Sequence, residues 1–334
     1  MKKQVLLLSI ALLSISAFAQ DSKEFKPNGK PHFNVFWNYH TDLSKDASQT
    51  SAFELKRSYL GYSYKFSEKI STKITFDVGN NSGGTAYTAF LKIAQLDWKV
   101  SSGVKLSMGV IGMKQFKTQE SFWGYRYISK SFQDQYGFGS SADLGVNAEF
   151  KVSDNFKANV TISNGEGYKK IQDEDGKQKF GVELVYYPIK EITTKMYADT
   201  QAVEGSDAVS ALSFFAGYKG SNFRLGAEYN TLSNGEKYSK PAQDHNLDGL
   251  SFYATYAFDK KWEAFARYDE LSSNTLSGAS QAWNMSKDGS QIIAGIQVTP
   301  LKGLKFSLNY QGFSFDDVAL DNDSKVYISA EFKL

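Results

Sequence analysis

The sequence predicts an all-β protein: a closed, antiparallel transmembrane β-barrel of about sixteen strands that follows a cleaved signal peptide. Three observations lead to this prediction. Apolar and polar residues alternate over segments of about ten residues from Gln20 to the end of the chain, the connections between these segments alternate between short and long, and 15% of the 334 residues are aromatic. A period of two is typical of strands with one apolar face, and an even number of strands suits a closed antiparallel barrel.

Residues 1–19 predict a signal peptide. Lys2 and Lys3 form its charged start, an apolar run follows from Val5 to Leu13, and Ala17 to Ala19 supply a small-x-small cleavage site. A signal anchor is the alternative, but the run is short for a helix that spans a bilayer. We expect residues 20–31 to form a short periplasmic segment and residues 32–334 to form the barrel.

Composition excludes several classes of protein. The chain has no cysteine and three histidines, which excludes disulfide scaffolds, zinc ribbons and thiol enzymes. Apart from its two leader lysines, the chain balances 36 acidic residues with the rest of its 38 basic residues, so no global charge favours nucleic acid. His245 lies beside Asp244 and Asp248, but a solvated polar loop explains this group better than a catalytic base does. We therefore predict no enzyme activity, no cofactor and no metal site.

The alternation is regular enough to place each strand. Phe156, Ala158, Val160 and Ile162, for example, alternate with four polar residues. A merged or split pair would change the count by two, so fourteen or eighteen strands remain possible. The sixteen segments are 32–41, 53–66, 70–79, 87–100, 104–113, 142–152, 155–164, 178–188, 191–201, 209–219, 222–232, 248–258, 261–271, 290–300, 303–313 and 324–334.

The connections form a short set and a long set that alternate along the chain. The short set includes 67–69, 153–154 and 259–260, and the long set includes 114–141 and 272–289. Strict alternation is expected when all long loops lie on one side of a membrane and all tight turns on the other. Both termini then lie on the tight-turn side, which is the periplasmic side in outer-membrane barrels.

Aromatic residues indicate that the apolar face contacts lipid. Residues of apolar parity recur next to the tight turns, as in the aromatic girdles of membrane barrels. A soluble β-sandwich with aromatic residues scattered through its core is the alternative. The predicted girdle comprises Phe66, Trp98, Phe156, Tyr186, Tyr218, Phe223, Phe258, Trp262 and Phe332.

One block of the sequence resembles a known family. Phe122 to Ile128 (FWGYRYI), Lys130 to Asp134 and Gly137 to Gly145 resemble porin-type outer-membrane barrels of the Bacteroidota, and Arg57 to Tyr62 and Leu96 to Trp98 are similar as well. The rhythm resembles the related phosphate-selective porin group over nearly the whole mature chain. The resemblance implies a trimeric diffusion channel of the outer membrane, surrounded by lipid and lipopolysaccharide.

A barrel of about sixteen strands leaves room for a water-filled channel, so we expect passive diffusion of small hydrophilic solutes and ions with a weak preference for anions. The longest loop, 114–141, is the candidate constriction if it folds inward; folded outward, it would be a surface loop. A barrel that does not conduct, as a subunit of a larger outer-membrane assembly, is the alternative function. The candidate constriction residues are Lys114, Lys117, Glu120, Arg126 and Lys130, and the candidate lumen residues are Arg57, Lys73, Asp77, Lys195, Arg224 and Arg267.

Overall fold

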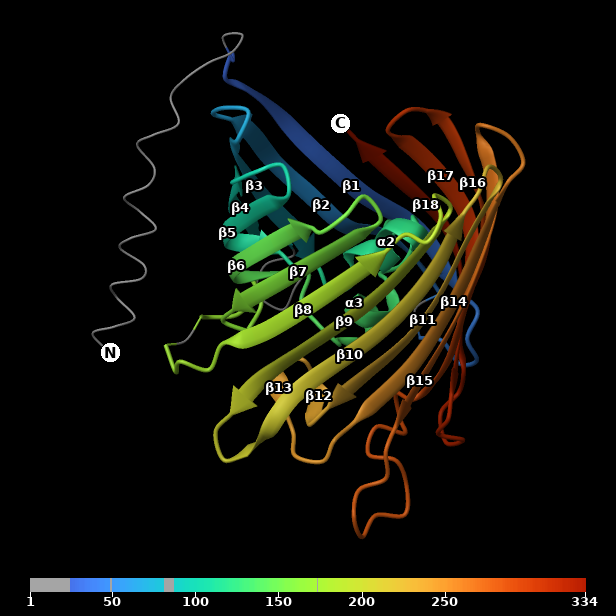
Figure 1. Ribbon diagram of the computed structural model, residues 1–334. Helices are drawn as coiled ribbons and strands as arrows, with labels where there is room; N and C mark the ends of the chain where they lie inside the picture. Colours follow the sequence, from blue (N-terminus) through green and yellow to red (C-terminus); the bar gives the residue numbers. More distant parts are fainter. Residues whose placement is uncertain (1–24, 49, 81–86, 173) are drawn as a thin grey trace.

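The computed structural model describes residues 25–48, 50–80, 87–172 and 174–334. Within these ranges, sixteen strands close into one antiparallel barrel (Figure 1). The predicted signal peptide, residues 1–19, lies outside the described residues. The barrel strands are β1 (Asn28–Asp42), β2 (Ser51–Lys65), β3 (Ile70–Asn80), β4 (Tyr87–Lys99), β5 (Val104–Gly112), β6 (Ala142–Lys151), β7 (Phe156–Ser163), β8 (Lys179–Tyr186), β9 (Ile192–Val203), β10 (Ser206–Lys219), β11 (Phe223–Ser233), β14 (Leu247–Ala257), β15 (Trp262–Ser273), β16 (Gly289–Leu301), β17 (Leu304–Phe315) and β18 (Asp323–Lys333).

Barrel strands that are consecutive in the sequence pair with each other, and β1 closes the barrel against β18. The predicted fold class and strand number are therefore confirmed. β1 begins at Asn28, earlier than the residue 32 that the alternation predicts. The sequence pattern also missed a short hairpin, β12 (Gly235–Lys237) with β13 (Lys240–Pro241), and two helices, α2 (Lys117–Trp123) and α3 (Phe132–Tyr136). No helix in the described ranges is long and apolar enough to cross a membrane.

The two faces of the sheet carry the side chains that the alternation assigns to them. On the outer face, Val160 is 43% exposed and Leu308 is 60% exposed, whereas Asn159 and Asn309 are buried on the inner face. An apolar outer face and a polar inner face are typical of a barrel surrounded by lipid. Of the predicted girdle residues, Trp98 and Phe156 are partly buried and the other members are exposed: Phe66, Tyr186, Tyr218, Phe223, Phe258, Trp262 and Phe332.

Candidate functional site

The segment between β5 and β6 lies inside the barrel, where Figure 1 shows α2 and α3 behind the near wall. Its large side chains are almost fully buried: Trp123, Tyr125, Tyr127, Phe132 and Phe138 are each at most 1% exposed. Each helix ends at a glycine with a positive φ, which lets the chain reverse direction within the confined lumen. We call residues 114–141 the inner loop.

Aromatic packing attaches the inner loop to one arc of the wall. The rings of Trp123 and Tyr125 pack on Phe265 of β15, with the Tyr125 and Phe265 centroids 4.1 Å apart. Phe36 of β1 belongs to the same cluster, as do residues of β10, β14 and β16. A second cluster joins Phe132 and Phe138 to aliphatic side chains of β10, β11, β14 and β15. The inner loop therefore covers the wall from β10 through β16 to β1.

Four cationic side chains of the wall donate hydrogen bonds to carbonyl oxygens of the inner loop. Lys195 on β9 donates to Lys114 and Gln115 at 2.9 and 2.7 Å, and Arg224 on β11 donates to Trp123 at 3.3 Å. Arg267 on β15 donates to the carbonyl of Lys130, and Lys56 on β2 donates to that of Ile128 at 2.6 Å. The bond to Gln115 is buried and the others are partly buried, so the cations satisfy loop carbonyls that water reaches poorly and thereby stabilise the loop's position.

Three of the six predicted lumen residues, Lys195, Arg224 and Arg267, thus lie beneath the inner loop. Lys195 is fully buried and lies 3.9 Å from Glu183, and Arg267 forms a buried ion pair with Asp269 at 2.5 Å. Their charge is directed at the loop and at neighbouring carboxylates. Sequence parity assigns them to the inner face, but it could not show that a loop covers them.

The charges of the inner loop are paired with one another or with the wall. Arg126 lies 3.7 Å from Glu120 and 3.4 Å from Asp134, and Lys130 lies 3.5 Å from the same Asp134 carboxylate. Lys117 lies 2.7 Å from Glu120. The predicted constriction residues therefore form one connected network, apart from Lys114, which pairs with Glu149 of β6 at 2.9 Å.

The opposite part of the wall brings further charged groups toward this network. Arg57 of β2 lies 3.2 Å from the buried carboxylate of Asp77 on β3. Lys73 is exposed on the same inner face of β3, as the alternation predicts.

Burial lowers the pKa of Lys130, in the inner loop, below its ordinary value, while Asp134 acts in the opposite direction.

Two β-bulges turn lysines inward that strict alternation would place on the outer face. Opposite the consecutive residues Phe36 and Trp37 of β1 stand Arg57 and Leu55, so Lys56 is the extra residue of β2. Lys92 is likewise the extra residue of β4, because the register with β3 steps from Ile93 to Leu91. A bulge leaves one residue unpaired and re-aims its side chain. A lysine at an outer-face position in mid-strand was the sequence signal that could have revealed both bulges.

A second loop, residues 165–172, also turns into the barrel. The Tyr168 hydroxyl donates to Asp77 on β3, and the Lys92 ammonium lies 5.3 Å from the Tyr168 ring centroid. Gly165 and Gly167 take positive φ values, and both donate their N–H groups to Asp143 of β6, at 2.7 and 3.1 Å. We call these residues the Tyr168 loop. No pattern in the sequence indicates that this loop folds inward.

The histidines lie in separate surroundings. His32 contacts the Thr75 hydroxyl at 3.0 Å, His40 contacts Asn38 at 3.2 Å, and His245 contacts the carbonyl of Gln243 at 2.8 Å. Within the described ranges, no group of three or more His, Asp or Glu residues is arranged to hold a metal ion.

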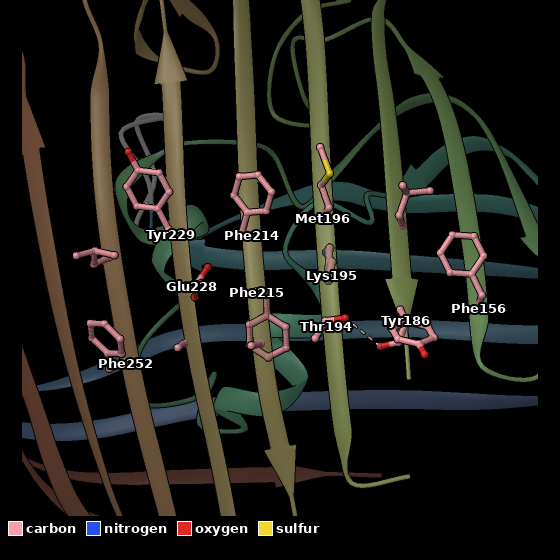
Figure 2. A pocket seen from close by; sticks show the side chains of 14 residues that line it. Phe156, Tyr186, Thr194, Lys195, Met196, Phe214, Phe215, Glu228, Tyr229 and Phe252 are labelled. Carbon is pink, nitrogen blue, oxygen red and sulfur yellow. Dashed lines mark hydrogen bonds between the residues drawn. The ribbon is translucent and has the colours of Figure 1, made fainter. Parts of the chain in front are cut away.

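A hollow of about 540 Å³ lies on the outer face of the barrel (Figure 2). It spans β7 to β14, where the small Ala216 and Ala227 lie between larger side chains such as Met196, Phe214 and Phe252. Most of its lining is apolar and faces outward, while Lys195, Phe215 and Glu228 of the inner face lie at its floor.

Comparisons with solved structures identify the architecture. The chain matches OmpF of Salmonella typhi, solved in complex with daunomycin, with a TM-score of 0.70 and 12% identity over 92% of this chain and 97% of that one. The chain has the porin fold. An anion-selective porin from Comamonas acidovorans matches with a TM-score of 0.68 and 12% identity, over 92% of this chain and 100% of that one. OmpT of Vibrio cholerae, in a trimer form, matches with a TM-score of 0.64 and 12% identity, over 93% and 100%. No family model and no curated protein matches the sequence.

Proposed function

We propose that this chain is an outer-membrane porin: a water-filled channel for passive diffusion of small hydrophilic solutes and ions, with a weak preference for anions. Both termini and the tight turns would face the periplasm, and the protein would assemble as a homotrimer among lipid and lipopolysaccharide. The trimer form of the similar Vibrio cholerae protein supports the oligomeric state. Porin-type folds with this number of strands leave an aqueous interior unless loops fill it.

The proposal rests on one observation: some charged side chains that face the interior are still exposed to solvent. Lys105 and Asp97 form an ion pair at 3.3 Å, and their side chains are 33% and 22% exposed. The side chains of Lys114 and Glu149 are 28% and 32% exposed. Asp97, Lys105 and Glu149 lie on β4, β5 and β6, away from the arc that the inner loop covers, and Lys114 is the first residue of the inner loop. Solvent-exposed charged side chains in this part of the lumen support a water-filled path beside the inner loop.

The preference for anions is proposed from the charges where the inner loop faces β2, β3 and β4. The cations there are Arg126 and Lys130 of the loop with Lys56, Arg57, Lys92 and Lys169 of the facing segments. The acids are Glu54, Asp77, Glu120 and Asp134. A small excess of cations in a narrow lumen raises the local concentration of anions.

Planar-bilayer recording of the purified, refolded barrel tests the proposed function. We expect discrete conductance steps in KCl and, under a salt gradient, a reversal potential on the anion-selective side. A correctly folded barrel that gives no steps would contradict the porin function and favour a structural subunit instead. Folding is checked independently by the shift in gel mobility that an unheated barrel shows.

A further inference from the structure

The Tyr168 loop brings an aromatic ring close to two lysines from different parts of the chain. The Lys92 ammonium lies 5.3 Å from the Tyr168 centroid, and that of the adjacent Lys169 lies 5.7 Å from it. Lys92 also lies 4.8 Å from the centroid of Tyr59, and Lys169 lies 5.0 Å from that of Phe90. Two ammonium groups and three aromatic rings therefore gather where the loop meets β2 and β4.

Neither ammonium group forms an ion pair within the described part of the chain. The Asp77 carboxylate acts on both ammonium groups, but it already accepts from Tyr168 and lies 3.2 Å from Arg57. A guanidinium and two ammonium groups thus share one buried carboxylate. Asp134 and Glu120 also act on Lys92, and both already pair with Arg126 in the inner loop. A cation–π contact at a partly exposed site is weaker than the hydrogen bond of an ammonium group to an oxyanion. An oxyanion therefore offers both lysines a stronger partner than the rings do.

The surrounding structure holds these groups in place before any ligand arrives. The two glycine N–H groups on Asp143 fix the start of the Tyr168 loop, and Gln172 donates to the carbonyl of Gly167 at 3.2 Å. Lys92 projects inward because it is the extra residue of a bulge, which fixes the direction of its side chain. Preorganised donors lose little entropy when a ligand binds.

We propose that Lys92, Lys169 and Tyr168 form a saturable site for the oxyanion group, carboxylate or phosphate, of a solute in the lumen. The site rests on the proposed function for its access to solute. It differs from the inner-loop network because, among the described residues, neither of its two lysines forms an ion pair, whereas Arg126 and Lys130 both pair with Asp134. The Lys92 and Lys169 ammonium groups donate to the oxyanion, and Arg57 adds positive charge from beside Asp77.

Equilibrium binding to the detergent-purified barrel tests the site without requiring conduction. Isothermal titration at pH 7 and low ionic strength uses inorganic phosphate in one arm and succinate in the other, with chloride as the competing anion. We expect saturable binding to the wild type that weakens at least about ten-fold in Lys92→Met and in Lys169→Met. Binding in only one arm identifies the preferred oxyanion, and binding in both identifies a general oxyanion site.

Lys157→Met is the matched control. Lys157 on β7 also lies over a tyrosine ring, with its ammonium 5.7 Å from the Tyr187 centroid, but it lies at the tight-turn end of its strand. This variant should bind as the wild type does, and Lys92→Arg should restore binding because it keeps the charge. No binding to the folded wild type, or equal losses in all three methionine variants, would overturn the site. A conducting barrel that binds neither probe overturns the site alone, whereas a folded barrel that binds but does not conduct overturns the porin function alone.

Discussion

The ammonium group of Lys195 lies 2.7 Å from the carbonyl oxygen of Gln115, which joins β9 of the wall to the start of the inner loop. The same ammonium donates to the carbonyl of Lys114 and to the Gln119 side chain, at 2.9 and 3.1 Å. One fully buried lysine thus satisfies three acceptors of the loop. The position of the inner loop therefore depends on the wall as well as on the loop's own packing.

Lys195→Met should destabilise the barrel by about 3 kcal/mol, because it leaves buried acceptors and the Glu183 carboxylate without their cation. The measurement is the free energy of unfolding in urea for the barrel inserted in lipid vesicles. Lys219→Met is the control, since Lys219 is exposed at the end of β10. Equal stability of the two variants would mean that Lys195 does not hold the loop.

Replacing residues 118–136 by a short Gly-Ser linker should raise single-channel conductance at least about two-fold, because α2, α3 and their buried aromatic side chains would leave the lumen. Single-channel recording in KCl measures the change. Shortening the loop 316–322, where Val318 is 97% exposed, is the control and should leave conductance unaltered. An unchanged conductance in the first variant would show that the inner loop does not limit the ion path.

Arg126→Gln combined with Lys130→Gln should move the reversal potential toward cations, because two cations are removed: Asp134 loses both of its partners and Glu120 keeps Lys117 alone. Glutamine avoids placing a new carboxylate beside these two acids. The shift should shrink in concentrated salt, as the Debye length falls from about 10 Å at 0.1 M to about 3 Å at 1 M. Lys45→Gln is the control, since Lys45 pairs with Asp321 in exposed loops. A selectivity that stays the same at low salt would place these charges outside the ion path.

The anion preference should weaken as pH rises through about 8. Burial, followed by the Arg57 guanidinium, lowers the pKa of Lys169 to about 8, so this lysine is charged below that pH and neutral above it. Asp77 acts in the opposite direction, while Lys92 and Lys130 act in the same direction as Arg57. In the unfolded chain, Lys169 stays protonated up to the ordinary lysine pKa. Its lower pKa in the folded barrel therefore reduces the stability of the fold below about pH 8, and this loss of stability diminishes as the pH rises above 8.

Reversal potentials at pH 7 and pH 9 measure this effect. Lys169→Met should remove the part of the pH dependence that Lys169 causes and should already show the weaker anion preference at pH 7. Lys157→Met should keep the dependence of the wild type. Identical pH profiles in the wild type and in Lys169→Met would rule out Lys169 as the titrating group.

Phe332→Asp should reduce the amount of protein in the outer membrane more than it reduces the stability of the folded barrel. Phe332 is exposed on the outer face of β18, opposite Leu304 and Val35. A carboxylate near the membrane interface costs about 1 kcal/mol or less, but it interrupts the apolar end of the last strand, which we expect assembly to require. Quantified membrane fractions and urea unfolding separate the two effects, with Phe332→Leu as the control. Normal membrane levels would refute the assembly role.

The sequence alone determined where each barrel strand lies. Residues such as Phe156, Val160, Leu304 and Leu308 alternate with polar neighbours, and this period of two is a local property that survives in the folded sheet. Alternating loop lengths added the antiparallel order, because each connection restricts which strands can be neighbours. The strand number and closure could therefore be predicted without any knowledge of long-range contacts.

Only the tertiary structure decided which charges face the lumen and which are covered. Lys56 and Lys92 turn inward through bulges that depend on the register with neighbouring strands, so a strict period of two assigns them to the wrong face. Lys195 lies on the predicted face, but it is buried by a loop that begins some eighty residues earlier in the chain. The sequence shows which side chains share a face of a strand, whereas burial and charge pairing depend on segments that are distant in the sequence and meet only when the barrel closes.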